Sequence, residues 1–395
     1  MATLTKELRR ELEQAVVCAR NVAEEGSRKA IESMAVHASD PWPSMSPDGK
    51  NLRNRLRARG RQLGDARDPK KETQTIEHLV AECAYEQWHR MLFARFLAEN
   101  HLLIEPDTGV AISLEDCQEL AREKKTDWVE LACRFAEGML PQIFRKGDPV
   151  LELTLPPENR TRLEKILKDL SKEIFVASDS LGWVYQFWQA EKKDKVNESG
   201  NKIGADELPA VTQLFTEDYM VDFLLDNTLG AWWAGKVLAA KPKLSETAKD
   251  EDELREAVSL PNVPWSYLRF VKGKVAKWMP AAGTFEGWPK TARELTCLDP
   301  CMGSGHFLVA MFQRVVAMRM AEEKLPEKAA TEAVIRDNLF GLEIDSRCTQ
   351  IAAFNLALAA WRRVGHCPLP AMHLACSGLG VVAKKEDWLA LAQKD

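Results

Sequence analysis

Apolar side chains recur every three or four residues through the first two hundred residues of the chain, a spacing typical of amphipathic helices. It predicts helices over residues 4–35, 75–100, 128–144 and 159–174, with a polar, proline-containing break at 40–44. Ser113-Leu114-Glu115-Asp116 has the form of a capped helix start, because a serine side chain can accept hydrogen bonds from the free amides of a first turn.

The helix predicted over residues 75–100 is strongly amphipathic. Its apolar set is Ile76, Leu79, Val80, Cys83, Trp88, Met91, Leu92 and Phe96. The aromatic residues Trp183, Tyr185, Phe187 and Trp188 are expected to pack in the core or between domains rather than to stack on a ligand. The polar residues 191–200 indicate a linker or a long surface loop, and a further helix is predicted over 216–234.

From residue 295 onward, short apolar strands alternate with apolar helices. Strands are expected at 297–298, 338–345 and 371–376, and helices at 307–321 and 348–364. This alternation is typical of a doubly wound parallel sheet that binds ligands at the carboxyl ends of its strands. We therefore expect an α-helical N-terminal domain over residues 1–205 and an α/β, Rossmann-like domain over 206–395. Because no further strands follow as far as Trp388, we expect this second domain to be incomplete.

Composition places the chain among ordinary globular proteins. Its 395 residues suffice for two or three domains, and they are 45% hydrophobic and 29% charged. The nine cysteines form no Cys-x-x-Cys pair, so we expect neither a metal site nor a disulfide framework. There is no apolar run of membrane-spanning length and no signal-peptide core, which predicts a reducing cytoplasm and no membrane partner.

The net charge of −5 excludes a uniformly basic nucleic-acid binder, but positive charge is concentrated in one stretch. Its candidate contacts to the phosphates of double-stranded DNA are Arg53, Arg55, Arg57, Arg59 and Arg61. The alternative is a solvated helix face or a mobile loop. Because arginines at every second position do not share one helical face, the sequence does not show which surface they form.

The most informative stretch runs from Leu298 to Leu308, with the sequence Leu-Asp-Pro-Cys-Met-Gly-Ser-Gly-His-Phe-Leu. A strand end leads into a loop with two glycines, and an apolar helix follows. Glycine permits positive φ and a close approach of the backbone to a ligand, and the helix start offers free N–H groups. This arrangement predicts a loop that holds a nucleotide-like cofactor with a carboxylate or a phosphate.

An acidic residue at the end of the next strand completes the pattern. Glu343 stands where a carboxylate can accept hydrogen bonds from ribose hydroxyls, and Asp345 is expected to cap the following helix. A dinucleotide-binding loop has a third glycine where Leu308 stands here, so the pattern speaks against a nicotinamide dinucleotide.

These motifs resemble those of the S-adenosylmethionine-dependent adenine-N6 DNA methyltransferases. The glycine loop is similar to their first motif, and Phe340-Gly341-Leu342-Glu343-Ile344-Asp345 looks like their second. The segment from Phe215 to Leu225 looks like the helix that enters the cofactor pocket, with Glu217 in place of the usual proline. The whole pattern is most similar to the large adenine methyltransferases of bacterial phage-defence systems (the BREX and DISARM type) and to fused restriction–modification enzymes.

The resemblance implies a class I methyltransferase fold and a role for each matching residue. Gly303 and Gly305 would wrap the methionine part of S-adenosylmethionine, and Asp299, next to Pro300 of the motif, would orient its ammonium directly or through water. Thr216 would contact the cofactor carboxylate, Glu343 the ribose diol, and Ile344 the adenine face. Phe307 would line the pocket or pack in its own helix, and Ser377 stands where the family often has an aspartate for the adenine. His306 receives no role.

The family's catalytic motif, Asn or Asp followed by two prolines and an aromatic residue, is absent from the sequence. Leu155-Pro156-Pro157-Glu158 precedes the glycine loop and lacks both the amide and the ring. Because adenine methylation requires a flipped base to be held by such groups, no catalytic residue is assigned. We expect the N-terminal portion of a site-specific methyltransferase, inactive alone, whose partners are DNA and other defence or restriction subunits or a missing C-terminal half.

Two alternatives remain open from the sequence. One is a non-enzymatic DNA-binding or scaffold subunit, which the basic stretch favours. The other is a methyltransferase that acts on RNA or protein, which the cofactor motifs alone do not distinguish from a DNA enzyme.

Overall fold

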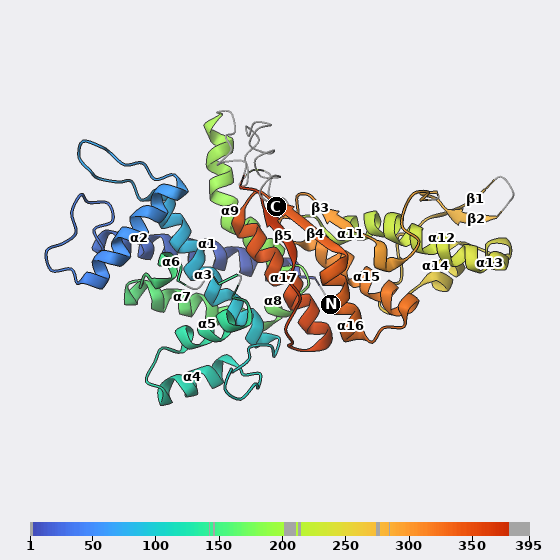
Figure 1. Ribbon diagram of the computed structural model, residues 1–395, viewed down its shortest axis with the longest axis horizontal. Helices are drawn as coiled ribbons and strands as arrows, with labels where there is room; N and C mark the ends of the chain where they lie inside the picture. Colours follow the sequence, from blue (N-terminus) through green and yellow to red (C-terminus); the bar gives the residue numbers. More distant parts are fainter. Residues whose placement is uncertain are drawn as a thin grey trace. The chain divides into compact units, whose positions relative to one another are not determined.

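The computed structural model describes residues 3–141, 143–144, 147–200, 211, 215–273, 277–283 and 285–378 (Figure 1). The chain divides into two compact units, Met1–Trp188 and Gln189–Asp395. Trp388, where the predicted alternation ends, lies outside the described residues. Among the described helices, none has the length and apolar character needed to cross a membrane.

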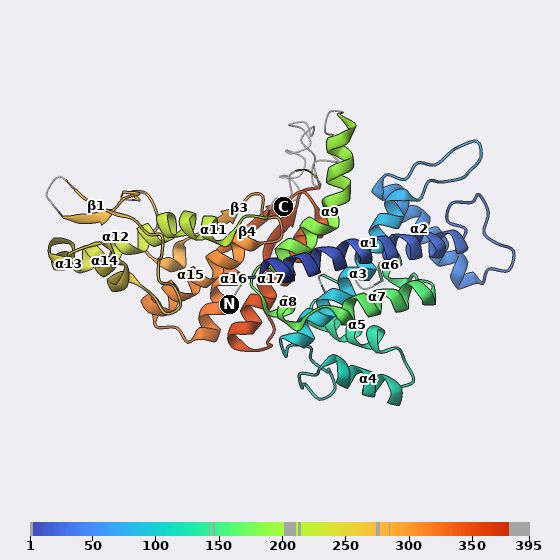
Figure 2. The same cartoon turned by 180° about the vertical axis from the view of Figure 1, so that it is seen from behind.

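The first unit is built from helices. They are α1 (Lys6–Ser33), α2 (Pro47–Leu63), α3 (Glu77–Glu99), α4 (Leu114–Glu123), α5 (Trp128–Met139), α6 (Pro149–Glu152), α7 (Pro157–Asp169), α8 (Lys172–Val176) and α9 (Ser180–Ser199), which continues past the unit boundary. Helix α3 contacts α1, α2, α5, α6, α7 and α8, and α1 runs beside it (Figure 2). The helical N-terminal region is therefore confirmed.

Helix α3 is central rather than amphipathic, which corrects the prediction. Its buried residues lie on every face and include the charged side chains Glu82, Arg90 and Arg95. These charges are buried because each is paired: Arg59 with Glu82, Arg90 with Glu130, and Arg95 with Glu99. A polar face in the sequence therefore became part of the core.

Several local predictions are confirmed. Ser113 and Asp116 form a reciprocal capping box at the start of α4. The aromatic cluster at the start of α9 is buried, with Tyr185 1% and Trp188 3% exposed. The helix predicted over 159–174 is instead two helices, because the N–H and hydroxyl of Ser171 bond the carboxylate of Glu11 at 2.7 and 2.9 Å.

The predicted linker at residues 191–200 is wrong for most of its length. Helix α9 continues through Ser199, and its Lys195–Glu191 ion pair joins neighbouring turns of the helix. Lysine and glutamate are good helix formers, so a run of charges without proline or glycine extends a helix as readily as it forms a loop.

The second unit combines helices with short strands. Its helices are α11 (Asp218–Leu225), the π-helical turn η1 (Asp226–Gly230), α12 (Ala231–Ala240), α13 (Pro242–Thr247), α14 (Glu251–Val258), the 3₁₀ turn η2 (Ala292–Glu294), α15 (His306–Glu323), α16 (Glu327–Asp337) and α17 (Ser346–Val364). The strands are β1 (Phe270–Lys272), β2 (Trp278–Pro280), β3 (Cys297–Asp299), β4 (Leu339–Glu343) and β5 (His373–Cys376). The helix predicted over 216–234 is thus α11 and α12 joined by a π turn.

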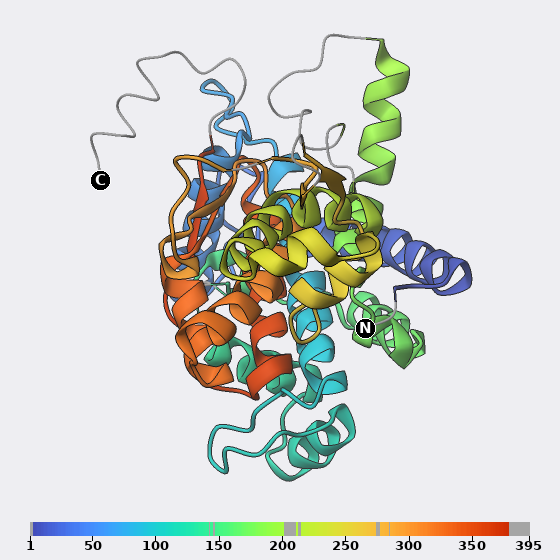
Figure 3. The same cartoon turned by 90° about the vertical axis from the view of Figure 1, so that its right-hand side faces the viewer.

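Strands β3, β4 and β5 form a parallel sheet in that order, with Leu298 opposite Phe340 and Gly341 opposite Leu374. Helices α15 and α17 contact each other and β4, so both cover one face of the sheet. Helix α16, which was not predicted, lies beside α15 (Figure 3). The three predicted strands and the helices α15 and α17 between them are confirmed, although three strands do not by themselves distinguish a doubly wound sheet from other parallel α/β folds.

The remaining two strands, β1 and β2, pair as a separate antiparallel hairpin that lies beside α12 and α13 (Figure 1). In the parallel sheet, the carboxyl ends of β3 and β4 lead directly into the loops that carry the predicted cofactor residues.

Candidate functional site

The loop between β3 and α15 has the backbone conformation that its glycines predict. Gly303 and Gly305 have φ values of 51° and 79°, in the left-handed region that other residues rarely adopt. A Cβ at Gly305 would lie 2.9 Å from the Cα and Cβ of Ala352 in α17. Glycine is therefore required at 305 both for the turn and for the close approach of two helices.

Glu343, at the end of β4, is bound directly to this loop. Its Oε2 accepts the N–H of Gly303 at 2.8 Å, and its Oε1 accepts the N–H groups of Ile344 and Asp345 at 2.8 and 3.1 Å. The residue is only 6% exposed. A carboxylate offers about four acceptor positions, so three are used within the fold and one is left for an outside hydroxyl.

Asp299 supplies a second carboxylate at the same edge of the sheet. Burial raises the pKa of its carboxyl above the ordinary value, the N–H of Cys301 partly offsets this, and the charge of Glu343 raises it further. Two neighbouring carboxylates, one of them poorly solvated, favour the approach of a cationic group.

The segment before α11 reaches the same loop. The ring of Phe215 lies 4.6 Å from the ring of His306, and the Nε2 of His306 lies 2.8 Å from the Oδ1 of Asp218. The half-buried Thr216 is between these two contacts in the sequence. The structure thus brings together parts of the three motifs that the sequence singled out, namely residues 215–218, 299–306 and 343–345.

The other candidates lie around this centre. Asp345 accepts the N–H of Arg347 at 2.9 Å and caps α17, as predicted. Ile344 is half-buried, Pro300 is exposed, and Phe307 is packed against the core of the unit. The N–H of Ser377 donates to the backbone oxygen of Glu343 at 2.8 Å, so this residue follows the strand next to the acid.

The sequence reasoning missed a buried charge network beside the loop. Arg314 of α15 donates to Asp222 at 2.8 Å and to Asp226 at 2.9 Å, and Asp226 is 1% exposed. The signal was present, since Asp218, Asp222 and Asp226 stand four residues apart and share a helix face.

Two of the predicted DNA-binding arginines are built into the fold. Arg53 and Arg57 of α2 are 4% and 7% exposed. Arg53 donates to the carbonyls of Ala35 and Ala38 at 2.9 and 2.7 Å, and Arg57 donates to that of Val36 at 3.0 Å. Their guanidinium groups therefore hold the turn after α1, and burial lowers the pKa of both.

The other three arginines of the stretch also have partners within the fold. Arg55 pairs with Glu152 at 2.8 Å and Arg59 with the buried Glu82 at 2.7 Å. Arg61 donates to the side-chain oxygen of Gln74 at 3.1 Å. A DNA role for the five arginines of the stretch stays a prediction.

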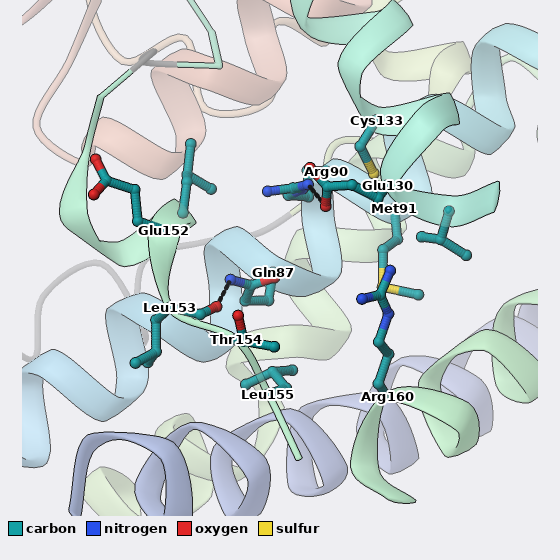
Figure 4. A pocket seen from close by; sticks show the side chains of 12 residues that line it. Gln87, Arg90, Met91, Glu130, Cys133, Glu152, Leu153, Thr154, Leu155 and Arg160 are labelled. Atoms are coloured by element: carbon teal, nitrogen blue, oxygen red, sulfur yellow. Dashed lines mark hydrogen bonds and ion pairs between the residues drawn. The ribbon is translucent and has the colours of Figure 1, made fainter. Parts of the chain in front are cut away.

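A cavity of about 510 Å³ lies in the first unit, between α3, α5 and the start of α7 (Figure 4). Its charged lining groups are matched within the fold: Arg90 pairs with Glu130, Arg160 with Asp127, and Glu152 with Arg55. The buried thiol of Cys133 has a raised pKa because burial disfavours the thiolate. We assign this cavity no ligand, since no charge in it is left to recognise one.

Comparison with known proteins places the chain near one group of enzymes. It is 28% identical over 321 residues to the adenine-specific methyltransferase BrxX of Escherichia coli O9:H4 (strain HS), covering 73% of this chain and 25% of that protein. The chain is related to the adenine-specific methyltransferases. A second such methyltransferase, PglX of Lacticaseibacillus casei (strain Zhang), is 26% identical over 355 residues, covering 80% of this chain and 28% of the relative. The predicted resemblance is confirmed.

The chain spans about a quarter of the length of the curated methyltransferases that it matches. A scan against protein-family models finds no match. Among solved structures, a cryo-EM structure of a DrdV–DNA complex matches this chain at 12% sequence identity and a TM-score of 0.38. The match covers 99% of this chain and 28% of the chain in that complex.

Proposed function

We propose that this chain is the S-adenosylmethionine-binding portion of a DNA adenine-N6 methyltransferase of a phage-defence or restriction–modification system. The observation that carries the proposal is the hydrogen bond between the Gly303 amide and the Glu343 carboxylate. This bond joins the glycine loop to the acid of the next strand, and Asp299 and the segment of Thr216 lie at the same place.

The residues present fit such a cofactor. Gly303 and Gly305 have no side chain and adopt a positive φ, which suits close contact of the backbone with an amino-acid tail. Asp299 and Glu343 suit a ligand that carries an ammonium and a sulfonium, because both groups are positive. When bound, the cofactor supplies a methyl group on a positively charged sulfur.

Each side chain then has a task in binding. Thr216 donates its hydroxyl to the cofactor carboxylate, and Asp299 orients the ammonium. Glu343 offers its remaining acceptor position to a ribose hydroxyl while its other positions hold the loop. Ile344 packs on the adenine face. The absence of methyl transfer by this chain alone, whose sequence has no Asn/Asp-Pro-Pro-aromatic motif, belongs to the same proposal.

Isothermal titration of the purified chain with S-adenosylmethionine and S-adenosylhomocysteine tests the binding. Both ligands should release or absorb heat, and Glu343→Ala and Gly303→Val should weaken both. Asp252→Asn, which removes a carboxylate 90% exposed at its side chain, is the control and should bind normally. A folded wild-type chain that binds neither ligand contradicts the proposal. Tritium transfer to DNA by the chain alone contradicts the claim of inactivity.

A further inference from the structure

A row of acidic side chains and a row of basic side chains face each other where α11 meets α15. Asp218, Asp222 and Asp226 form the acidic row, four residues apart, and His306 and Arg314 form the basic row, eight residues apart. The pairs meet at 2.8 Å for Asp218 with His306 and 2.8 and 2.9 Å for Arg314 with the other two aspartates. We call these five residues the aspartate clamp.

The far end of the clamp is buried and rigid. Arg314 and Asp226 have side chains that are 9% and 2% exposed, and the second oxygen of Asp226 accepts the N–H of Tyr267 at 3.0 Å. Trp265 packs on the guanidinium at 5.9 Å and so close to Gly230 that a Cβ there would lie 2.6 Å from its ring. The ion pair, this hydrogen bond and the packing of Trp265 together fix the π turn against α15.

The near end, next to the glycine loop, has less support. The outer face of α11 is exposed and not covered by other described residues, since the side chains of Tyr219 and Phe223 are each 52% exposed. The buried Oδ1 of Asp218 has no hydrogen bond among the described residues, and the Nε2 of His306 lies 2.8 Å from it. His306 contacts the segment that carries Thr216 at two places, through its ring at Phe215 and through its Nε2 at Asp218.

We infer that His306 and Asp218 are positioning residues that hold Thr216 against the glycine loop, so that the site selects ligands with an amino-acid carboxylate. The inference rests on the proposed function. It accounts for a histidine directly after Gly305 without giving it a part in proton transfer, because its Nε2 faces Asp218. The pair acts on the amino-acid end of the cofactor and leaves the nucleoside end to Glu343 and Ile344.

Two ligands separate this role from a general structural one. S-adenosylhomocysteine has the amino-acid tail, whereas 5′-methylthioadenosine has the same nucleoside and sulfur without it. Asp218→Asn and His306→Ala should each weaken S-adenosylhomocysteine about ten-fold, the size expected for one hydrogen bond to a charged group, and change 5′-methylthioadenosine less than about two-fold. His306→Gln keeps a donor near the position of Nε2 and should retain more affinity than His306→Ala.

A double-mutant cycle and a melting curve complete the experiment. Asp218→Ala and His306→Ala should be non-additive, because each removes the same contact. Asp252→Asn should change neither affinity, and the melting temperatures show that the variants are folded. Should His306→Ala fail to fold, the half-exposed Asp218→Asn still gives the two affinities.

The failures are distinguishable. A wild-type chain that binds S-adenosylhomocysteine, with variants that lose both ligands equally or lose neither, overturns the positioning role and leaves the proposed function standing. A wild-type chain that binds neither ligand overturns both.

Discussion

The basic stretch of α2 and the glycine loop before α15 both stand out in the sequence as candidate functional sites, but their side chains have different surroundings in the structure. In α2, the guanidinium groups of Arg53 and Arg57 donate hydrogen bonds to backbone carbonyls of the turn that precedes the helix. Around the loop, three segments distant in sequence converge on Gly303 and Glu343. The number of charges in a segment does not tell in which direction the side chains point. A glycine in a strand-to-helix loop, followed by an acid at the end of the next strand, restricts the backbone conformation of that loop.

The largest effect should come from Gly305, where the loop approaches α17. Gly305→Ala combines a left-handed conformation with a Cβ 2.9 Å from Ala352, and should lower the free energy of unfolding by about 3 kcal/mol. Gly283 has a φ of 87° and nothing within 4 Å of its Cβ position, so Gly283→Ala should cost only about 1 kcal/mol. Urea unfolding measures both. Equal losses would show that the contact with Ala352 does not require glycine.

The next effect tests whether the basic stretch is structural. Arg53→Ala should lower the free energy of unfolding by about 2–3 kcal/mol, because it removes the hydrogen bonds of a buried guanidinium to the carbonyls of Ala35 and Ala38. Arg55→Ala removes an ion pair whose arginine is 40% exposed and should cost less than about 1 kcal/mol. An Arg53→Ala chain of unchanged stability that no longer shifts DNA in a gel would reverse our interpretation of this region.

A smaller effect on stability is expected at Glu343, whose carboxylate both accepts backbone N–H groups of the fold and, by our proposal, binds a ribose hydroxyl. Glu343→Gln places an NH₂ against backbone N–H groups and should lower the free energy of unfolding by about 1–2 kcal/mol while it weakens S-adenosylhomocysteine. Glu246→Gln, which disrupts a surface pair with Lys277, is the matched control. If Glu343→Gln matched this control in urea unfolding and in titration, the acid would not be joined to the loop as described.

The smallest effect distinguishes binding from stability at Asp299. Since burial raises the pKa of this carboxyl, its ionised form disfavours the folded state at neutral pH, and that penalty disappears as pH falls below the unfolded value of about 3.9. Asp299→Asn should therefore stabilise the ligand-free chain at pH 7 by less than about 1 kcal/mol, with no gain at pH 3. Its affinity for S-adenosylmethionine should fall. Thermal melts at both pH values and a titration provide the measurements, and a destabilised Asp299→Asn at pH 7 would contradict the sign.

Periodicity was sufficient for most helices but not for their environment. The spacing in α3 showed a helix, yet only packing shows that Glu82 and Arg90 are paired inside the unit. The charged end of α9 was read as a linker because the same residues suit loops and exposed helices. The break at Ser171 was invisible because it depends on Glu11, 160 residues away in the chain.

At the candidate site, the sequence alone determined the local chemistry: two glycines in a strand-to-helix turn, an acid at the next strand end, and a capping aspartate at 345. These features act within a few residues and follow from backbone geometry. Tertiary structure decided which groups meet. It bound the guanidinium groups of Arg53 and Arg57 to backbone carbonyls and placed His306 against Asp218. Such contacts form between segments whose separation in the sequence carries no information about their distance in space.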